Sequence, residues 1–451
     1  MQNISRENKM GSMPINKLLL SMAVPIMISM MVQAFYNVVD SYFVAKISEN
    51  ALTAVSMAFP IQNLMIAVGV GTGVGMNALL SRSLGEQRPD KANHFAMQGI
   101  VILLIGYLLF LVIGLFFTGP FMTTQTDIAE IISYGTDYLR ICCCFSVGLF
   151  MQFAFERISQ GTGRTMDSMI SQTTGAVTNI ILDPIFIFGL GPIPQFGVAG
   201  AAIATVLGQM LGATVGFILV VTKNKDIRLS LRGLIPDTKA MGRILQIGFP
   251  SILMASVGSL TTFVMNQILF GFTSTAVAVY GAYFKLQSFI FMPVMGLNNG
   301  MVPIIGYNFG ARNRARVDET IALSKRYALF IMCFGLALFQ LLPNQLLSLF
   351  EASEQMLTIG VPALRIISIH FPVAAICIIS GSVCQALGFS VYSLIISICR
   401  QLLVLLPVAY LMSLTGNINL VWLSFLAAEA VSFVISTRFA KKSLNSLDWN
   451  K

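Results

Sequence analysis

Charged side chains are scarce in this chain of 451 residues. Only 10% of the residues are charged, whereas 56% are hydrophobic and the mean hydropathy is +0.79. A soluble globular chain carries roughly 25% charged residues, so this composition cannot cover a water-facing surface. The apolar residues come in long blocks, which predicts an integral membrane protein built from helices and not from a β-barrel.

Metal-binding and disulfide patterns are also missing. The chain has only two histidines, His94 and His370, and its seven cysteines form no Cys-x-x-Cys pair. Cysteines in apolar runs behave as small buried apolar residues. We therefore expect neither a zinc site nor a disulfide framework.

Twelve apolar blocks are long enough to cross a bilayer, which takes about 20 residues. They cover residues 18–44, 54–80, 95–118, 131–155, 166–189, 199–221, 244–270, 277–305, 327–343, 357–384, 390–413 and 419–438. The net charge of +9 does not indicate nucleic-acid binding, because the basic residues fall at the ends of these blocks. With the N-terminus inside, 23 of the 28 Lys and Arg residues are cytoplasmic and the outer loops hold only Lys46. This bias predicts a multi-pass inner-membrane protein with both termini in the cytoplasm.

The two halves of the sequence align at a constant offset of 225 residues. The matched residues include Pro25 with Pro250, Gly71 with Gly296, Gly75 with Gly300, Arg140 with Arg365, and Gln160 with Gln385. Six spans per repeat is an even number, so both repeats insert the same way round and are related by a pseudo-twofold axis along the membrane normal. We expect an N-terminal lobe at 1–221, a cytoplasmic linker at 222–243 and a C-terminal lobe at 244–451.

Two matching six-helix bundles suit alternating access. The duplication therefore predicts a transporter and not an enzyme, with no cofactor.

A small set of polar residues lies at one depth inside the first lobe. Asp40, Asp183 and Thr205 sit at similar distances from the outer ends of spans 1, 5 and 6. Tyr36 and Asn179 are each four residues before one of the aspartates, on the same helix face. An ionised Asp at the bilayer centre costs about 2.5–3.5 kcal/mol, so such residues mark functional sites. This oxygen-rich set suits a shared proton or Na⁺, the latter held by Asp40, Asp183 and Asn179. The alternative is that Asp40 caps a loop and Asp183 marks the end of span 5.

Three further charges fall inside or beside apolar blocks, and each has two interpretations. Glu156 either forms a cytoplasmic ion pair with Arg157 or contacts the substrate. Glu429 is either part of a second site or a partner for Arg400. Lys285 faces either a cleft or the protein interior.

Several segments resemble the multidrug and toxic compound extrusion (MATE) family along essentially the whole chain. They are QGTG at 160–163, NIILDPIFIF at 179–188 and GVAGAAIAT at 197–205, together with Asp40 in span 1. Members of this family are secondary antiporters that export cationic, amphipathic compounds in exchange for H⁺ or Na⁺. In prokaryotic members a cation site in the N-terminal lobe is built from positions that match Tyr36, Asp40, Asn179, Asp183 and Thr205.

The resemblance implies an all-α membrane antiporter for multidrug efflux. Its expected partners are small organic cations and the lipid bilayer, with no nucleic acid, and we expect it to work as a monomer. The alternative is a flippase for a lipid-linked or anionic substrate, which would need a strongly cationic cleft. Lys285 and Arg400 are the candidates for such a cleft.

Overall fold

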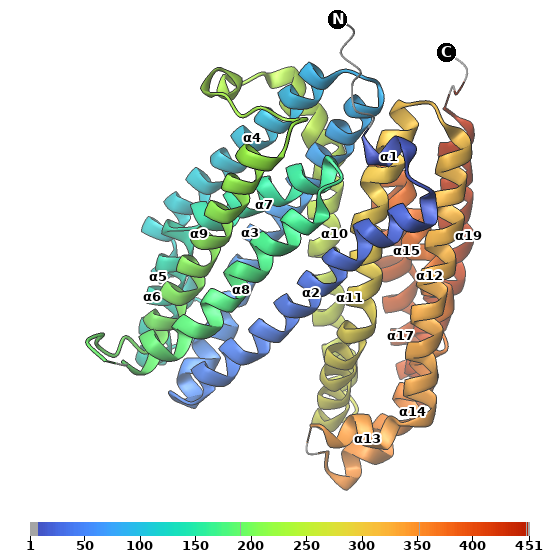
Figure 1. The fold of residues 1–451 in the computed structure, drawn as a ribbon. Coiled ribbons are helices and arrows are strands. Elements are labelled where there is room, and N and C mark those ends of the chain that lie inside the picture. The colour runs from blue at the N-terminus through green and yellow to red at the C-terminus, as the bar shows by residue number, and fades with distance from the viewer. Residues whose placement is uncertain (1–7, 190, 351, 448, 450–451) are drawn as a thin grey trace, which may run out of the picture. The chain divides into compact units, whose positions relative to one another are not determined.

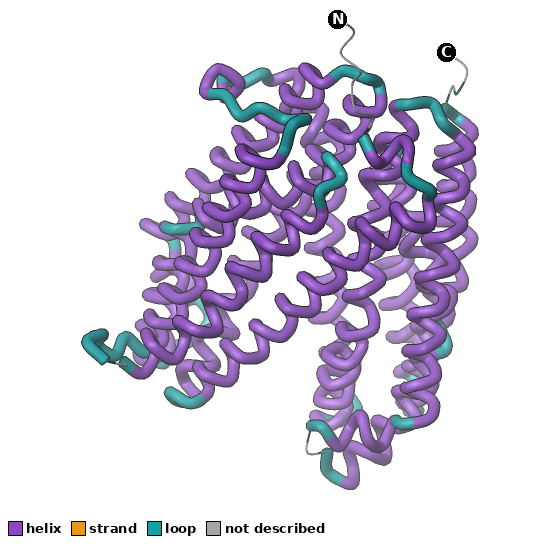
Figure 2. Tube along the Cα trace, viewed as in Figure 1, coloured by secondary structure: helices purple, strands orange, loops and turns teal. Residues whose placement is uncertain are grey.

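The structure is a computed structural model that describes residues 8–189, 191–350, 352–447 and 449. Within these ranges every regular element is a helix, and short loops join the helices (Figure 2). The prediction of an all-α membrane protein is therefore confirmed.

The first repeat runs from α1 to α9 (Figure 1). Its helices are α1 (Lys9–Ser12), α2 (Ile15–Ala45), α3 (Glu49–Gly85), α4 (Pro89–Phe116), α5 (Thr118–Thr123), α6 (Ala129–Cys144), α7 (Val147–Gly161), α8 (Thr165–Phe188) and α9 (Val198–Lys223). A connecting segment with one short 3₁₀ turn, η1 (Leu231–Leu234), leads to the second repeat.

The second repeat runs from α10 to α19. Its helices are α10 (Thr238–Phe270), α11 (Ser274–Gly310), α12 (Arg314–Leu341), α13 (Pro343–Ser348), α14 (Glu354–Ser368), α15 (Phe371–Ala386), α16 (Ser390–Ile398), the π-helix η2 (Cys399–Leu405), α17 (Leu406–Ser413), α18 (Ile418–Trp422) and α19 (Ser424–Asn445).

The helix boundaries follow the offset of 225 residues seen in the sequence. Helices α3, α4 and α5 begin and end at positions that map onto the bounds of α11, α12 and α13. Each repeat also opens with a long helix that contains a proline, Pro25 in α2 and Pro250 in α10. The duplication therefore extends from sequence to local structure.

Nine helices in the described ranges are long and apolar enough to cross a membrane, and two bent helix pairs raise this number to 11. The pairs are α6 with α7 and α14 with α15, bent by 46° and 49°. Helix α8, with 24 residues, corresponds to the remaining predicted span and is less apolar because it carries polar residues such as Asn179 and Asp183. Together these segments account for the twelve predicted spans.

The sequence predicts continuous spans over 131–155 and 357–384, and these predictions were wrong in one respect. Both helices break in the middle, the first at residues 145–146 and the second at 369–370. In the second, Pro372 stands at the start of α15, where a missing backbone N–H is tolerated. Hydropathy does not detect such a break because the apolar character continues across it.

The described chain packs as two compact units. One contains the described part of Met1–Gly11 together with Ile28–Ile252, and the other contains Ser12–Met27 together with Leu253–Lys451. The first halves of α2 and α10 thus belong to a different unit from their second halves. The lobe boundaries at 221 and 244 stay a prediction, since this grouping follows packing and not the ends of spans.

Glycines allow close helix crossings at equivalent places in the two units. In the first unit, a Cβ on Gly71 or Gly75 would overlap the backbone or a side chain of α10. In the second unit, a Cβ on Gly296 would lie 2.7 Å from the Cα of Met27 on α2. Small residues let membrane helices approach closely, so these glycines fix how α3 meets α10 and how α11 meets α2.

The turn between α3 and α4 is repeated between α11 and α12. Gln87 and Arg312 occupy equivalent positions and both have a left-handed backbone, with φ of 59° and 57°. Beside the first turn, Glu86 accepts hydrogen bonds from Lys91 and Arg82. Burial raises the pKa of Glu86, but these two basic partners lower it more, so the pKa lies below its usual value.

Candidate ion-coupling and cargo site

The two buried aspartates of the first repeat lie next to each other. Asp40 is near the end of α2 and Asp183 is near the end of α8, and both belong to the first unit. Asp183 has no exposed surface and Asp40 is half-buried. Their carboxyl groups lie within hydrogen-bonding contact of each other. Such a contact between two carboxyl groups requires one of them to carry a proton.

Asn179 joins the aspartate pair to α9. It lies one turn before Asp183 on α8, and its amide nitrogen donates to Asp183 Oδ1 and to Thr205 Oγ1, both at 3.2 Å. Helices α8 and α9 pack against each other at Gly175 and Gly208, where an added Cβ on Gly208 would lie 2.7 Å from the carbonyl oxygen of Gly175. The close approach brings Thr205 within reach of the amide.

Tyr36 and a second tyrosine surround the pair. Tyr36 lies one turn before Asp40 on α2, near enough to interact electrostatically with both carboxylates. Tyr138 on α6 interacts with Asp40 and Tyr36, and its hydroxyl accepts a hydrogen bond of 3.1 Å from Gln62 of α3. The structure thus brings together the five residues of the predicted site and adds Tyr138 and Gln62.

Three oxygens of this cluster lack a hydrogen-bond donor. They are Asp40 Oδ1, Asp183 Oδ2 and Asn179 Oδ1, and all three are buried. A buried acceptor without a partner costs about 1–3 kcal/mol, and more when it is charged. The donor set is made of carboxylate, amide and hydroxyl oxygens, which suits a hard monovalent cation or a proton. One bound positive charge would offset this deficit.

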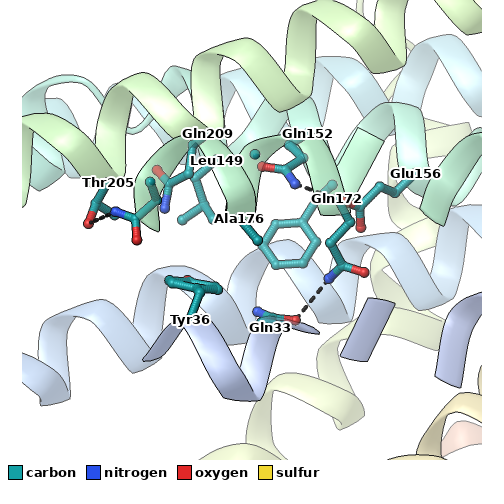
Figure 3. A pocket seen from close by; sticks show the side chains of 12 residues that line it. Gln33, Tyr36, Leu149, Gln152, Glu156, Gln172, Ala176, Thr205 and Gln209 are labelled. Carbon is teal, nitrogen blue, oxygen red and sulfur yellow. Dashed lines mark hydrogen bonds between the residues drawn. The ribbon is translucent and has the colours of Figure 1, made fainter. Parts of the chain in front are cut away.

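A small cavity of about 50 Å³ adjoins the cluster (Figure 3). Tyr36 and Gln33 line it from α2, and Figure 3 shows them facing side chains of α7, α8 and α9. Its lining also includes Thr205 and Asn179, so the cavity opens directly onto the ion cluster. Pockets for drug-sized ligands measure about 300–1,000 Å³. The cavity must therefore widen before it can hold such a ligand.

Four glutamines on four helices give the cavity its polarity. They are Gln33, Gln152, Gln172 and Gln209. Gln172 donates to Gln33 Oε1 at 2.8 Å, which ties α8 to α2. The sequence reasoning missed these residues, although each lies three, four or seven positions from a predicted site residue on its own helix. That spacing places them on the same helix faces and could have found them.

Glu156 is a buried lining residue of the same cavity. Its Oε1 accepts a hydrogen bond of 3.0 Å from Gln152, one turn earlier on α7. The neighbouring Arg157 donates instead to Gln160 at 3.0 Å, and among the described residues no ion pair joins Glu156 to Arg157. The one carboxylate in the cavity beyond the aspartate pair is thus placed to face a ligand.

The remaining predicted charges lie in the second unit. Arg400 and Glu429 approach each other with 3.6 Å between Nη1 and Oε2. Lys285 is exposed on α11, and its ammonium group lies 5.9 Å from the ring centre of Phe350. These two cations therefore point at partners of their own and do not form one cationic cluster.

A duplicated, multi-pass helical protein with buried carboxylates beside a polar cavity belongs to the class of membrane transporters. The family model described as MatE matches residues 25–185 and 250–411, which are the two repeats. The chain belongs to the MatE family.

Curated relatives and solved structures agree with this assignment. The chain is 28% identical over 419 residues to the multidrug export protein MepA of Staphylococcus haemolyticus, covering 92% of this chain and 91% of that protein. It is 26% identical over 408 residues to the FAD transporter of Shewanella oneidensis, covering 90% of each chain. A solved outward-facing multidrug resistance MATE family transporter has the same fold, with a TM-score of 0.92, 23% identity and 99% of each chain covered.

Proposed function

We propose that this protein is a secondary antiporter that exports cationic, amphipathic organic compounds in exchange for H⁺ or Na⁺. It works by alternating access, as a monomer in the inner membrane with both termini in the cytoplasm. The observation that carries this proposal is the group of three unpartnered oxygens on Asp40, Asp183 and Asn179. The similarity to multidrug export proteins supports the choice of cargo.

The coupling ion binds where the cluster lacks positive charge. A proton would bridge Asp40 and Asp183, whose carboxyl groups are already in contact. Sodium would take oxygens from the same two residues and from Asn179 Oδ1. In either case the ion cancels the negative charge that would otherwise attract a cationic cargo, so ion and cargo compete for the same charge.

Helix α2 is the element through which ion binding would act on the rest of the protein. Its first half packs in the second unit, and its second half, with Tyr36 and Asp40, packs in the first. A change in the hydrogen bonds of Asp40 therefore acts on a helix that both units share. A differential interaction of ~1–3 kcal/mol changes affinity 5–150-fold, which is sufficient coupling for exchange.

The cargo would enter the cavity from the side of the glutamines. Glu156 supplies a negative charge for a cation, and the glutamine amides can either donate or accept hydrogen bonds. Amides of this kind tolerate ligands of varied polarity, which suits a transporter with several substrates. The cavity must widen for this step, in keeping with a conformational cycle.

The test is ethidium efflux from reconstituted vesicles, with the pH gradient and the Na⁺ gradient varied separately. Asp40→Asn and Asp183→Asn should reduce gradient-driven efflux to the level of empty vesicles. Asp90→Asn, the same change at an exposed cytoplasmic position of α4, should keep the parental rate. Parental efflux in both site variants would contradict the proposed site, and efflux that ignores both gradients would contradict antiport.

A second candidate function is transport of an anionic cargo, including a lipid-linked one carried by a flippase. The 26% identity to a FAD transporter favours it. The structure offers little for binding an anion, because Arg400 already approaches Glu429 and Lys285 lies over an aromatic ring. Efflux measured with FAD in place of ethidium decides between the two cargo classes.

A further inference from the structure

A cluster of buried ionisable residues in the second unit plays no part in the exchange proposed above. His370, Glu429 and Tyr283 are almost fully buried, while Arg400 keeps 29% of its side-chain surface exposed. They come from four elements, α15, α19, α11 and η2, and α15 packs against α19 and α11 (Figure 1). No residue of the aspartate site belongs to this unit.

The cluster forms at two irregular places in the helices. His370 stands at the break between α14 and α15, where the chain bends by 49°. Arg400 lies in η2, a π-helix of seven residues. Interrupted helices and π-helices inside membrane proteins are frequently associated with functional sites. Here they bring an imidazole and a guanidinium group to the same carboxylate.

The geometry leaves space for one proton. His370 Nδ1 and Arg400 Nη1 both point at Glu429 Oε2, at 3.9 and 3.6 Å, and neither distance is short enough for a hydrogen bond. His370 Nδ1 and Glu429 Oε1 are both buried without a partner. On the other side of the ring, Nε2 lies 3.4 Å from the hydroxyl of Tyr283.

Protonation would satisfy both sides of the imidazole. A neutral ring has only one N–H, so it can donate either toward Glu429 or toward Tyr283. An imidazolium has two, and could donate from Nδ1 to Glu429 and from Nε2 to the Tyr283 oxygen. A small rotation of the ring would close the gap of 3.9 Å, because hydrogen bonds between charged partners are shorter and stronger.

Few other groups influence His370. Glu429 and Arg400 are the charged residues that act on it electrostatically. Tyr283 and Tyr280 from α11 and Cys377 from α15 are the nearby groups that can titrate. From α12 the ring of Phe339 packs against Tyr283 and carries no charge. Glu429 favours the imidazolium and Arg400 opposes it.

We infer that His370 and Glu429 form a second proton-binding site, in which one proton from water binds the imidazole and is held between Glu429 and Tyr283. Arg400 keeps the carboxylate ionised and sets how tightly the proton is held. The site is separate from the proposed ion site of the first unit, and its test requires no transport.

The test uses the fact that the chain has only two histidines. His94 forms an exposed contact with Asp237, so His94→Gln leaves His370 as the only histidine signal in protein labelled with ¹⁵N-histidine. We expect one titration step in which both ring nitrogens of His370 change from the imidazolium to the neutral pattern as the pH rises.

Partner variants show whether the cluster controls that step. Glu429→Gln should lower the midpoint by about 1–3 pH units, which is the usual effect of removing an opposite charge at this distance. Arg400→Gln should raise it, and Tyr283→Phe should lower it by removing the acceptor beside Nε2.

Two results would overturn the inference. One is a His370 signal that stays neutral from about pH 5 to pH 8 in the parent and in Arg400→Gln. The other is a midpoint that Glu429→Gln and Tyr283→Phe leave unchanged, as expected if Glu429 is only the ion-pair partner of Arg400. Glu429→Asp gives a second measurement if Glu429→Gln does not fold, because it keeps the charge and should shift the midpoint less.

Discussion

Replacing Asn179 by alanine should change the pH at which the exporter works without removing either aspartate. Asn179 is the amide donor to Asp183, at 3.2 Å, and Asp183 has no exposed surface that water could reach. A hydrogen bond to a charged group contributes about 1.5–3 kcal/mol. One pH unit corresponds to 1.36 kcal/mol, so the ionised form of Asp183 should lose roughly 1–2 units of stabilisation.

The sign of the shift follows from which form loses its partner. Without the amide, ionised Asp183 is less stable, so the proton is released only at higher pH. We expect the pH profile of ethidium efflux by Asn179→Ala to move upward by roughly 1–2 units. Thr205→Ala is the matched control, because it removes the other acceptor of the same amide and leaves the bond to Asp183 in place. A profile of Asn179→Ala that coincides with the parental one would refute this reasoning.

Three further predictions concern cargo binding, helix packing and the cytoplasmic turn. Glu156→Gln should raise the half-saturating ethidium concentration about tenfold, which corresponds to a loss of about 1.4 kcal/mol, and should affect a neutral cargo less; equal effects on both cargoes would exclude a charge contact. Gly75→Ala should lower the thermal unfolding midpoint because the added Cβ overlaps a backbone carbonyl of α10, at a cost of about 1–3 kcal/mol, whereas Gly242→Ala meets open space and should change little. Glu86→Gln should be less stable than the parent at neutral pH, and the difference should disappear as the pH falls through the lowered pKa of Glu86, because that contribution exists only while the carboxylate is ionised; a difference that persists in acid would show another cause.

Hydropathy and internal duplication predicted much of the fold. Twelve apolar blocks became twelve spans because a membrane helix must satisfy its own backbone and therefore needs a continuous apolar run. The offset of 225 residues predicted equivalent helices, and α3 and α11 follow it at both ends. Where the helices break, at 145–146 and 369–370, the apolar pattern continues, so hydropathy carries no signal.

Helix depth and helix-face periodicity also went far for the polar cluster. Asp40, Asp183 and Thr205 were chosen because each lies at a similar depth, and the structure brings them together through Asn179. Depth does not specify which side chains pair, since a hydrogen bond depends on rotamers and on how closely two helices approach. For that reason the pairing of Gln172 with Gln33 was not foreseen.

The packing of the first helix of each repeat in both units could not be predicted from local sequence. The exchange depends on contacts of α2 near Met27 and of α10 near Ile252, between residues far apart in the chain. Pro25 and Pro250 lie close to these points, but a proline inside a helix indicates a kink and not a change of packing partner.

The most direct measurement is the release of ions when cargo binds to the purified protein. In a weakly buffered solution with ethidium added at saturating concentration, the parent should release protons or bound Na⁺, whichever ion drives efflux. The variant with both Asp40→Asn and Asp183→Asn should release fewer, because the carboxylates that exchange ion for cargo are gone. Cargo binding by the parent with no ion released, or with the same release from the double variant, would contradict exchange at this aspartate pair.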